Sequence, residues 1–281
     1  MFLSLIGLSF FFQLPLGIDL ERGPSSSELS FRFSSGHLIQ VDGRIGTQGN
    51  LKFILDTGAT ISIVDQKVAD KLKLDHHPAE SFNFDRRLNW ESAIVPEIQF
   101  GPIKAAHVVM FVGKLAEYSD FAKNADAVIG LDLLKLSNFS IELATKKIIF
   151  TGTTPKAHES AVDRFSDCLI LEVRVQGHPV QLIVDTGVPD MLLYEERLHK
   201  RVPSLRMGSN VTDVIMGGRL KAKQTVVSGV SFGKGTRDIT VLLLPSPSPE
   251  VLPGIEGVIG IAPLKARRVN FDFVGRTFSF E

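Results

Sequence analysis

The chain has 281 residues, enough for two domains of about 120 residues each. Hydrophobic residues make up 44% of it, and Lys plus Arg and Asp plus Glu both number 31, so no net charge attracts nucleic acid or an anionic surface. The single cysteine, Cys168, excludes an internal disulfide, and the seven histidines are scattered, so neither a metal nor another cofactor is expected.

The N-terminal residues 1–17 are nearly all apolar. This length fits a signal-peptide core better than a transmembrane helix. No Lys or Arg precedes the run and no Ala-x-Ala site follows it, so an N-terminal strand or a mis-assigned start codon is the alternative. The sequence predicts an exported protein, periplasmic or secreted, without a membrane span in the mature chain. A cytoplasmic protein is the alternative.

A first unit is expected over residues 36–150, after a polar, Ser-rich tether over 18–35. The pattern predicts, in chain order, a strand from Leu38, a helix over 66–72 capped by Asp65, a polar irregular stretch over 75–92, a turn at Phe100-Gly101-Pro102, a buried strand over 108–112 and a short helix over 131–136. This reading is all-β with a few short helices.

A second unit is expected over residues 168–281, after a linker over 151–167. Its apolar residues alternate from Leu169 to Val175, as in a strand with one buried face, and a short helix is expected around residues 195–198. The proline-rich run 245–249 predicts a surface loop because proline cannot donate to a strand ladder.

The triplet Asp-Thr-Gly occurs twice, at residues 56–58 and 185–187, and closes an apolar run each time. An acidic residue at the end of a buried strand is costly, so two in matching contexts suggest a pair built to meet. Two facing carboxyl groups share one proton and the pKa of one of them rises. Such a pair activates water with one group and donates a proton from the other.

The duplication extends well beyond the triplets. Val128-Ile129-Gly130 recurs as Val258-Ile259-Gly260, and a pair of short apolar strands follows each copy at the same offset. The constant register indicates one fold repeated within the chain. The duplication makes a catalytic pair more probable than two isolated turns, whereas Asp132 and Asp272 are interpreted as structural. Asp132 suits a helix start, and Asp272 is expected to point outward between two phenylalanines.

These residues resemble the aspartic protease superfamily, specifically the bacterial retropepsin-like group with two lobes in a single chain. The segments that carry the resemblance are Phe53 to Thr60, Ala127 to Leu134 and their second copies, and it covers about residues 36–281. It implies a bilobal, all-β pepsin/retropepsin-like acid protease fold with two pseudo-twofold-related β-barrel lobes. It also implies a cleft for an extended peptide or protein substrate, and a monomer, since one chain supplies both Asp residues.

Asp56 and Asp185 are the expected catalytic pair of an aspartic endopeptidase. Gly58 and Gly187 lack side chains, so their amides can approach the carboxylates. The resemblance implies that the hydroxyls of Thr57 and Thr186 hydrogen bond across the lobe interface. It also assigns Ala59 and the glycines of the two later elements to the support of the pair.

The family resemblance also implies a flap over the cleft. Counting the same distance from each triplet gives two sets of candidates: Leu88, Asn89 and Trp90 in the first lobe, and Met216, Gly217 and Gly218 in the second. The two glycines suit a mobile hairpin tip. Trp90, the only tryptophan, either closes over the substrate or anchors a loop.

The second triplet is followed by Val188-Pro189, where the family has a small or hydroxylated residue first. Val188 is larger, and Pro189 removes a backbone donor. The pair could survive this departure, or the loop could shift and leave a catalytically silent peptide-binding module with a retained bilobal cleft. Retention of both carboxylates favours the enzyme, because an unneeded buried pair costs stability.

Overall fold

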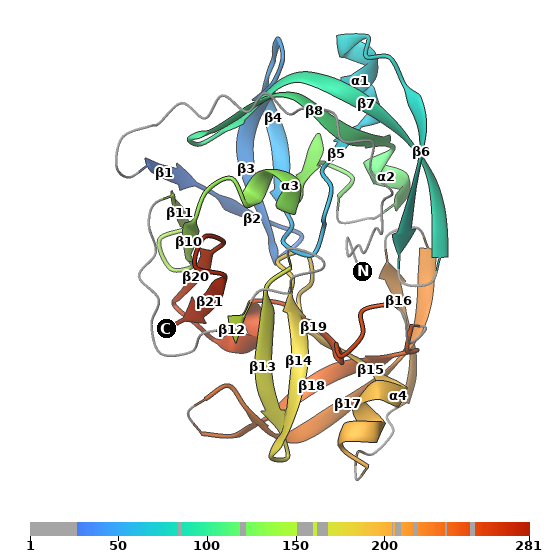
Figure 1. The fold of residues 1–281 in the computed structure, drawn as a ribbon, viewed down its shortest axis with the longest axis vertical. Coiled ribbons are helices and arrows are strands. Elements are labelled where there is room, and N and C mark those ends of the chain that lie inside the picture. The colour runs from blue at the N-terminus through green and yellow to red at the C-terminus, as the bar shows by residue number, and fades with distance from the viewer. Residues whose placement is uncertain are drawn as a thin grey trace.

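A computed structural model describes residues 27–83, 86–118, 122–150, 160–161, 168–203, 205, 209–215, 218–233, 235–247 and 251–281. Two β-rich lobes, one above the other in Figure 1, are joined by a shared sheet at one side. The all-β bilobal fold expected from the sequence is therefore confirmed. Among the described residues, no helix has the length and apolar character needed to cross a membrane.

The first lobe is built on an eight-stranded sheet with the order β2-β3-β4-β9-β5-β8-β7-β6. Its strands are β2 (Arg32–Ser34), β3 (Leu38–Ile45), β4 (Gln48–Leu55), β5 (Ile63–Asp65), β6 (His77–Asn83), β7 (Arg86–Phe100), β8 (Ile103–Gly113) and β9 (Ala127–Ile129). Its helices are α1 (Gln66–Leu72), α2 (Leu115–Tyr118) and α3 (Leu131–Leu134). As expected, the Asp65 side chain caps α1 by accepting a hydrogen bond from the Lys67 amide.

The second lobe repeats this plan in a seven-stranded sheet with the order β13-β14-β19-β15-β18-β17-β16. Its strands are β13 (Ile170–Val175), β14 (His178–Val184), β15 (Met191–Tyr194), β16 (Ser209–Ile215), β17 (Gly218–Ser231), β18 (Arg237–Leu244) and β19 (Gly257–Ile259). Helix α4 (Glu195–Arg201) and the short 3-10 helix η1 (Ala262–Leu264) complete the lobe. The strand order that starts at β3 in the first sheet is the same as the order that starts at β13 in the second. The repeat seen in the sequence is therefore also a repeat of topology.

A third sheet joins the lobes, with the order β1-β11-β10-β20-β21-β12. Its strands are β1 (Ser27–Ser30), β10 (Phe139–Glu142), β11 (Lys147–Phe150), β12 (Ser160–Ala161), β20 (Arg268–Asp272) and β21 (Thr277–Phe280). At its centre β10 pairs with β20 of the other lobe, and Phe139 stacks on Phe271 with ring centroids 4.8 Å apart. The lobes therefore share both a hydrogen-bond ladder and an aromatic core.

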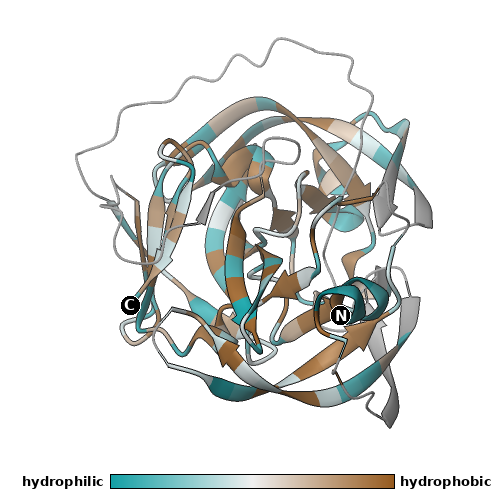
Figure 2. Ribbon diagram, turned by 60° about the horizontal axis from the view of Figure 1, so that its bottom comes forward, coloured by the Kyte–Doolittle hydropathy of each residue, from teal (hydrophilic) through white to brown (hydrophobic). Residues whose placement is uncertain are grey.

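Both lobes are packed through the alternation of apolar and polar side chains along their strands, visible as bands of brown and teal in Figure 2. In β13, for example, Leu171, Val173 and Val175 are buried while Glu172 and Arg174 are exposed. Most buried apolar residues of both lobes belong to one extended core cluster that also includes phenylalanines of the shared sheet, and two smaller clusters hold most of the others. This continuity holds the two lobes as one body.

Three sequence expectations are wrong. Residues 27–34 of the expected tether form β1 and β2, because backbone pairing with β11 and β3 needs no apolar side chains at a sheet edge. The stretch 75–92, expected to be irregular, forms the β6/β7 hairpin. Asp272 does not point outward: it is buried, and it accepts hydrogen bonds from the Asn138 side chain at 2.5 Å and from the Gly275 amide at 2.7 Å.

Candidate active site

Asp56 and Asp185 each follow the strand that runs through the middle of their lobe, and the two loops meet where the lobes touch, at the centre of Figure 1. Strand β4 pairs in parallel with β9, and β14 pairs in parallel with β19. The ladders extend into the loops, since the Asp56 amide donates to Ile129 O and the Asp185 amide donates to Ile259 O, both at 2.9 Å. Each acidic residue therefore starts from a fixed backbone position.

The two carboxyl groups face each other. Oδ1 of Asp56 accepts from the Gly58 amide at 2.9 Å, and Oδ1 of Asp185 accepts from the Gly187 amide at 2.7 Å. Oδ2 of each residue is buried and receives no hydrogen bond from a donor among the described residues. These two oxygens are thus left for each other and for a reactant.

Glycine is required in both loops because each faces the opposite carboxyl group. A Cβ on Gly58 would lie 2.2 Å from Oδ2 of Asp185, and a Cβ on Gly187 would lie 2.8 Å from Oδ2 of Asp56. No side chain fits in either space. The identity of these glycines is therefore set by the close approach of the pair.

Burial and mutual repulsion keep a proton on the pair. Both side chains are fully buried. Burial raises the pKa of Asp56 well above its usual range, and the charge of Asp185 and a hydrogen bond to it raise that pKa further. Burial also raises the pKa of Asp185, while the hydrogen bond from Asp56 lowers it. The pair therefore retains one shared proton above the pH range in which an isolated Asp side chain loses it.

The threonines of the triplets link the two loops symmetrically. The Thr57 hydroxyl donates to Val184 O at 2.9 Å, and the Thr186 hydroxyl donates to Leu55 O at 2.8 Å. Each hydroxyl oxygen also accepts the backbone amide of the other threonine at 3.1 Å. These four buried hydrogen bonds cross from lobe to lobe and fix the spacing of the two carboxyl groups.

Val188 and Pro189, which depart from the residues usual in the family, do not change the backbone turn: the second loop has the same turn as the first. The Val188 amide donates to Asp185 O at 3.4 Å, as the Ala59 amide donates to Asp56 O at 3.3 Å. Val188 is buried in an apolar cluster that includes Leu131 of the first lobe. The branched side chain is thus accommodated at the lobe interface.

The flap candidates lie in two long hairpins, β6/β7 and β16/β17, which extend toward each other on the same side of the molecule in Figure 1. Leu88 and Asn89 lie in β7, and Gly218 begins β17, whereas Met216 and Gly217 lie outside the described residues. Trp90 is buried and stacks on Phe111 with ring centroids 5.5 Å apart, so it anchors its hairpin. Closure over a substrate stays a prediction.

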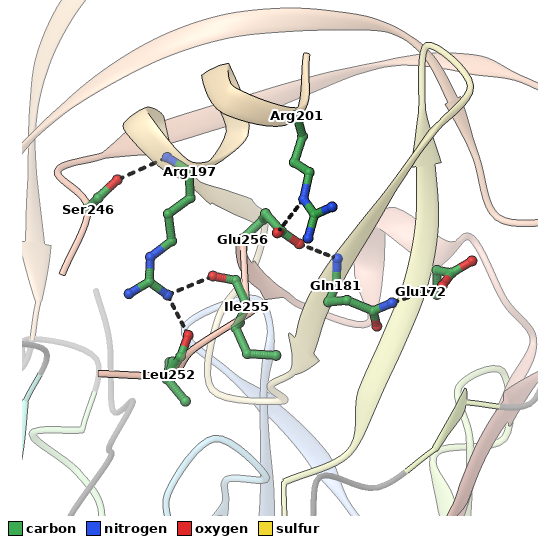
Figure 3. Close-up of polar contacts among 8 residues, drawn as sticks. All are labelled: Glu172, Gln181, Arg197, Arg201, Ser246, Leu252, Ile255 and Glu256. Atoms are coloured by element: carbon green, nitrogen blue, oxygen red, sulfur yellow. Dashed lines mark hydrogen bonds and ion pairs between the residues drawn. The ribbon is translucent and has the colours of Figure 1, made fainter. Parts of the chain in front are cut away.

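Two acidic residues missed in the sequence bind backbone amides of β4 and β14, the strands that precede the two catalytic triplets. Glu256 accepts from the Gln181 amide at 2.7 Å and pairs with Arg201 at 3.0 Å, as Figure 3 shows. Asp126 does the same in the first lobe, accepting from the Lys52 amide at 2.8 Å and pairing with Lys67. Both stand just before the apolar-apolar-Gly element at an offset of 130, a signal present in the repeat.

His37 is a further residue that sequence reasoning missed. It comes from the turn before β3 in the first lobe; its Nδ1 lies 3.2 Å from Ser35 O, and the backbone of Gly187 in the second lobe acts on its pKa. Burial lowers its pKa. Nothing in its polar sequence context signals this contact. Within the described ranges, no three His, Cys, Asp or Glu side chains gather as a potential metal site.

Comparison with known families agrees with this geometry. Residues 41–136 match the family model described as gag-polyprotein putative aspartyl protease. The matched segment runs from β3 to the end of α3 and contains the first Asp-Thr-Gly loop. No curated protein matches the chain significantly. This match in one lobe, the same strand order in the other and an Asp-Thr-Gly loop from each together support a retropepsin-like aspartic protease family.

Proposed function

We propose that the protein is an aspartic endopeptidase that hydrolyses peptide bonds with water activated by Asp56 and Asp185. The observation that carries this proposal is the pair of fully buried carboxyl groups, one from each lobe, whose Oδ2 atoms receive no other hydrogen bond from the described residues. An extended peptide or protein substrate and a monomeric enzyme are part of the proposal, since one chain supplies both groups.

The chemistry follows from the single shared proton. The ionised group of the Asp56/Asp185 pair accepts a proton from a water molecule as the water oxygen attacks the scissile carbonyl carbon, and the protonated group gives its proton to the carbonyl oxygen. The resulting gem-diol collapses when one group of the pair gives its proton to the amide nitrogen and the other takes a proton from a gem-diol hydroxyl, so that the C–N bond breaks and a carboxylic acid and an amine are released. The pair then again holds one proton, and no covalent enzyme intermediate forms.

The decisive experiment is cleavage of an unfolded protein by wild type, Asp56→Asn and Asp185→Asn. Each variant keeps the shape of the side chain but cannot share a proton, so proteolysis should be lost while the fold is retained. Asp126→Asn is the matched control, because it makes the same change at an acidic residue of the first lobe that supports β4 behind the site. Near wild-type turnover in either dyad variant would exclude the dyad as the catalyst.

The alternative, a catalytically silent peptide-binding module, predicts a different set of results. Wild type would then bind unfolded peptide without cleaving it, and both Asn variants would bind as well as wild type. The retained turn at Val188 gives this alternative no structural support.

Export also stays a proposal, since residues 1–17 lie outside the described residues. We expect the protein isolated from its native host to lack these residues, because their apolar run has the length of a signal-peptide core. N-terminal sequencing decides this. An intact Met1 on cytoplasmic protein would contradict export.

A further inference from the structure

The loop that carries Asp56 is joined to the start of α3 by Asp132. Oδ2 of Asp132 accepts from the Ser62 amide at 3.0 Å, and Oδ1 accepts from the Ser62 hydroxyl at 2.6 Å. Oδ1 also accepts from the Leu133 amide at 3.0 Å. The sequence suggested only a helix start for Asp132, but its carboxylate binds a residue of the catalytic loop.

Ser62 passes this connection to the backbone behind the catalytic triplet. Its hydroxyl accepts from the Gly130 amide at 2.9 Å while it donates to Asp132, so the hydroxyl has one orientation as long as Asp132 accepts. The Leu131 amide donates to Ala59 O at 2.7 Å, next to the triplet. A change at Asp132 therefore reaches the loop of Asp56 through two short steps.

The second lobe lacks this device. Met191 and Ala262 stand at the positions that match Ser62 and Asp132, at the offsets of the triplets and of the two glycines. The Gly260 amide there donates to a backbone oxygen, Asp190 O, at 2.9 Å. The second catalytic loop thus forms without a carboxylate at the position of Asp132. The fold alone therefore does not require Asp132.

The ionised form of Asp132 fits its surroundings better than the protonated form. Three donors point at the carboxylate, and a proton on Oδ2 would face the Ser62 N–H. Burial raises its pKa to about 6, and this rise is opposed by the hydrogen bonds from Ser62 and Leu133 and by the charge of Lys135 on the same segment. A charge kept at a partly buried site suggests a role beyond folding.

We propose that Asp132 is a positioning residue: its ionised carboxylate holds Ser62, and through it the Asp56 loop, in the catalytic geometry, and its protonation releases that loop. This inference rests on the proposed proteolytic function. According to this inference, the loss of activity at low pH is controlled by Asp132, a titrating group outside the dyad. The protonation acts on turnover, because Asp132 contacts the loop and not the Oδ2 atoms of the dyad.

The test is the pH dependence of kcat and of KM for wild type, Asp132→Asn and Ser62→Ala. Wild-type kcat should fall as the pH decreases through about 6, with KM little changed. Asn resembles the protonated acid, because its amide group faces the Ser62 N–H, so Asp132→Asn should have the low kcat of acidified wild type at neutral pH and lack this step. Ser62→Ala removes a donor to the carboxylate, so its step should move to higher pH.

Asp126→Asn is the matched control, since it neutralises a carboxylate of the same lobe that accepts a backbone amide away from the catalytic loop. It should keep the pH step of wild type. The proposal would be overturned if Asp132→Asn had the kcat of wild type at neutral pH. It would also be overturned if the variant had a reduced kcat that still fell as the pH decreased through about 6. If Asp132→Asn does not fold, Ser62→Ala provides the test. A pH step in kcat of Ser62→Ala at the same pH as in wild type, or at a lower pH, would contradict the proposal.

A second readout separates this proposal from the proposed function. In the inactive Asp56→Asn background, the amide NMR signals of Gly58 and Ser62 should titrate near pH 6, and this titration should disappear in Asp56→Asn/Asp132→Asn. Absence of the titration would exclude Asp132 as a switch whatever the enzyme does. Proteolysis that survives Asp56→Asn would exclude the dyad mechanism and leave this titration unaffected.

Discussion

At the scale of single residues, the dyad couples activity to stability. The folded-state pKa of Asp56 is raised above its unfolded value by burial and by Asp185, so its contribution to stability is present in acid and is lost as the pH rises through the raised pKa. Catalysis therefore needs a pair that weakens the fold at neutral and alkaline pH.

Asp185→Asn should relieve this cost. With the like charge removed, the free energy of unfolding should exceed that of wild type by about 1–3 kcal/mol above neutral pH, and the difference should shrink in acid, where wild type is protonated. Urea unfolding of both proteins across the pH range measures it. A difference that is constant with pH would show that repulsion within the dyad is not its cause.

Val188 gives a second residue-scale prediction. Its side chain is buried beside Leu131 at the lobe interface, so Val188→Ala should lower the free energy of unfolding by about 1–3 kcal/mol. Activity should be equal or higher, because the backbone turn at Val188 already matches the turn at Ala59. Paired measurements of kcat/KM and urea unfolding check this, and a large loss of activity in a folded variant would assign Val188 a positive role in the cleft.

The dyad was predictable from the sequence because Asp-Thr-Gly and the later glycines recur at a constant offset, and a repeat of this kind reports on topology. The support of the dyad was less predictable. Asp132 hydrogen bonds with a residue 70 positions earlier, and His37 contacts the other lobe. Such contacts depend on how loops turn after their strands, which apolar periodicity does not encode.

At the scale of elements, helix α4 holds the loop that precedes β19. The Arg197 guanidinium donates to four carbonyl oxygens, two of which are drawn in Figure 3. The four acceptors are Leu252 O at 2.5 Å, Ile255 O at 2.8 Å, Val251 O at 2.5 Å and Pro247 O at 3.4 Å. One side chain thus replaces the regular structure that this loop lacks.

Arg197→Ala should therefore lower the free energy of unfolding by about 2–4 kcal/mol, since several carbonyl groups lose their donor. Arg197→Lys should recover only part of it, because an ammonium group cannot serve a planar array of acceptors. Thermal and urea unfolding give both values. Equal stability of the Lys variant and wild type would argue that the charge alone holds the loop.

The hairpins show the limit of element prediction. Residues 75–92 contain many polar side chains, yet they form two strands that pair from His77 with Ser92 to Asn83 with Arg86. The strands of a hairpin are held by their backbone hydrogen-bond ladder, which needs no alternation of apolar side chains. Strand β13, by contrast, was predicted correctly, because its apolar residues alternate with polar ones.

At the scale of the whole molecule, the lobes are joined by more than the connecting chain. The β10/β20 ladder, the threonine hydrogen bonds and Asn138, which accepts from the Phe273 amide at 2.8 Å, all cross between them. A specific protease site inserted between residues 151 and 159, once cut, should leave two fragments that elute together with activity retained. The double variant Thr57→Val/Thr186→Val should weaken this association, and separation of the nicked wild-type fragments would contradict it.

The unequal supports of the two catalytic loops have a consequence for substrate direction. A peptide has an amino and a carboxyl end, and a site made from two identical halves presents the same groups to it in either direction. In this chain one loop is held by the Ser62–Asp132 pair, and the other has Met191 and Ala262 at those positions. In the proposed mechanism the scissile bond therefore meets two different halves, and the orientation of the bound chain decides which carboxyl group stands beside the attacking water and which beside the departing amine.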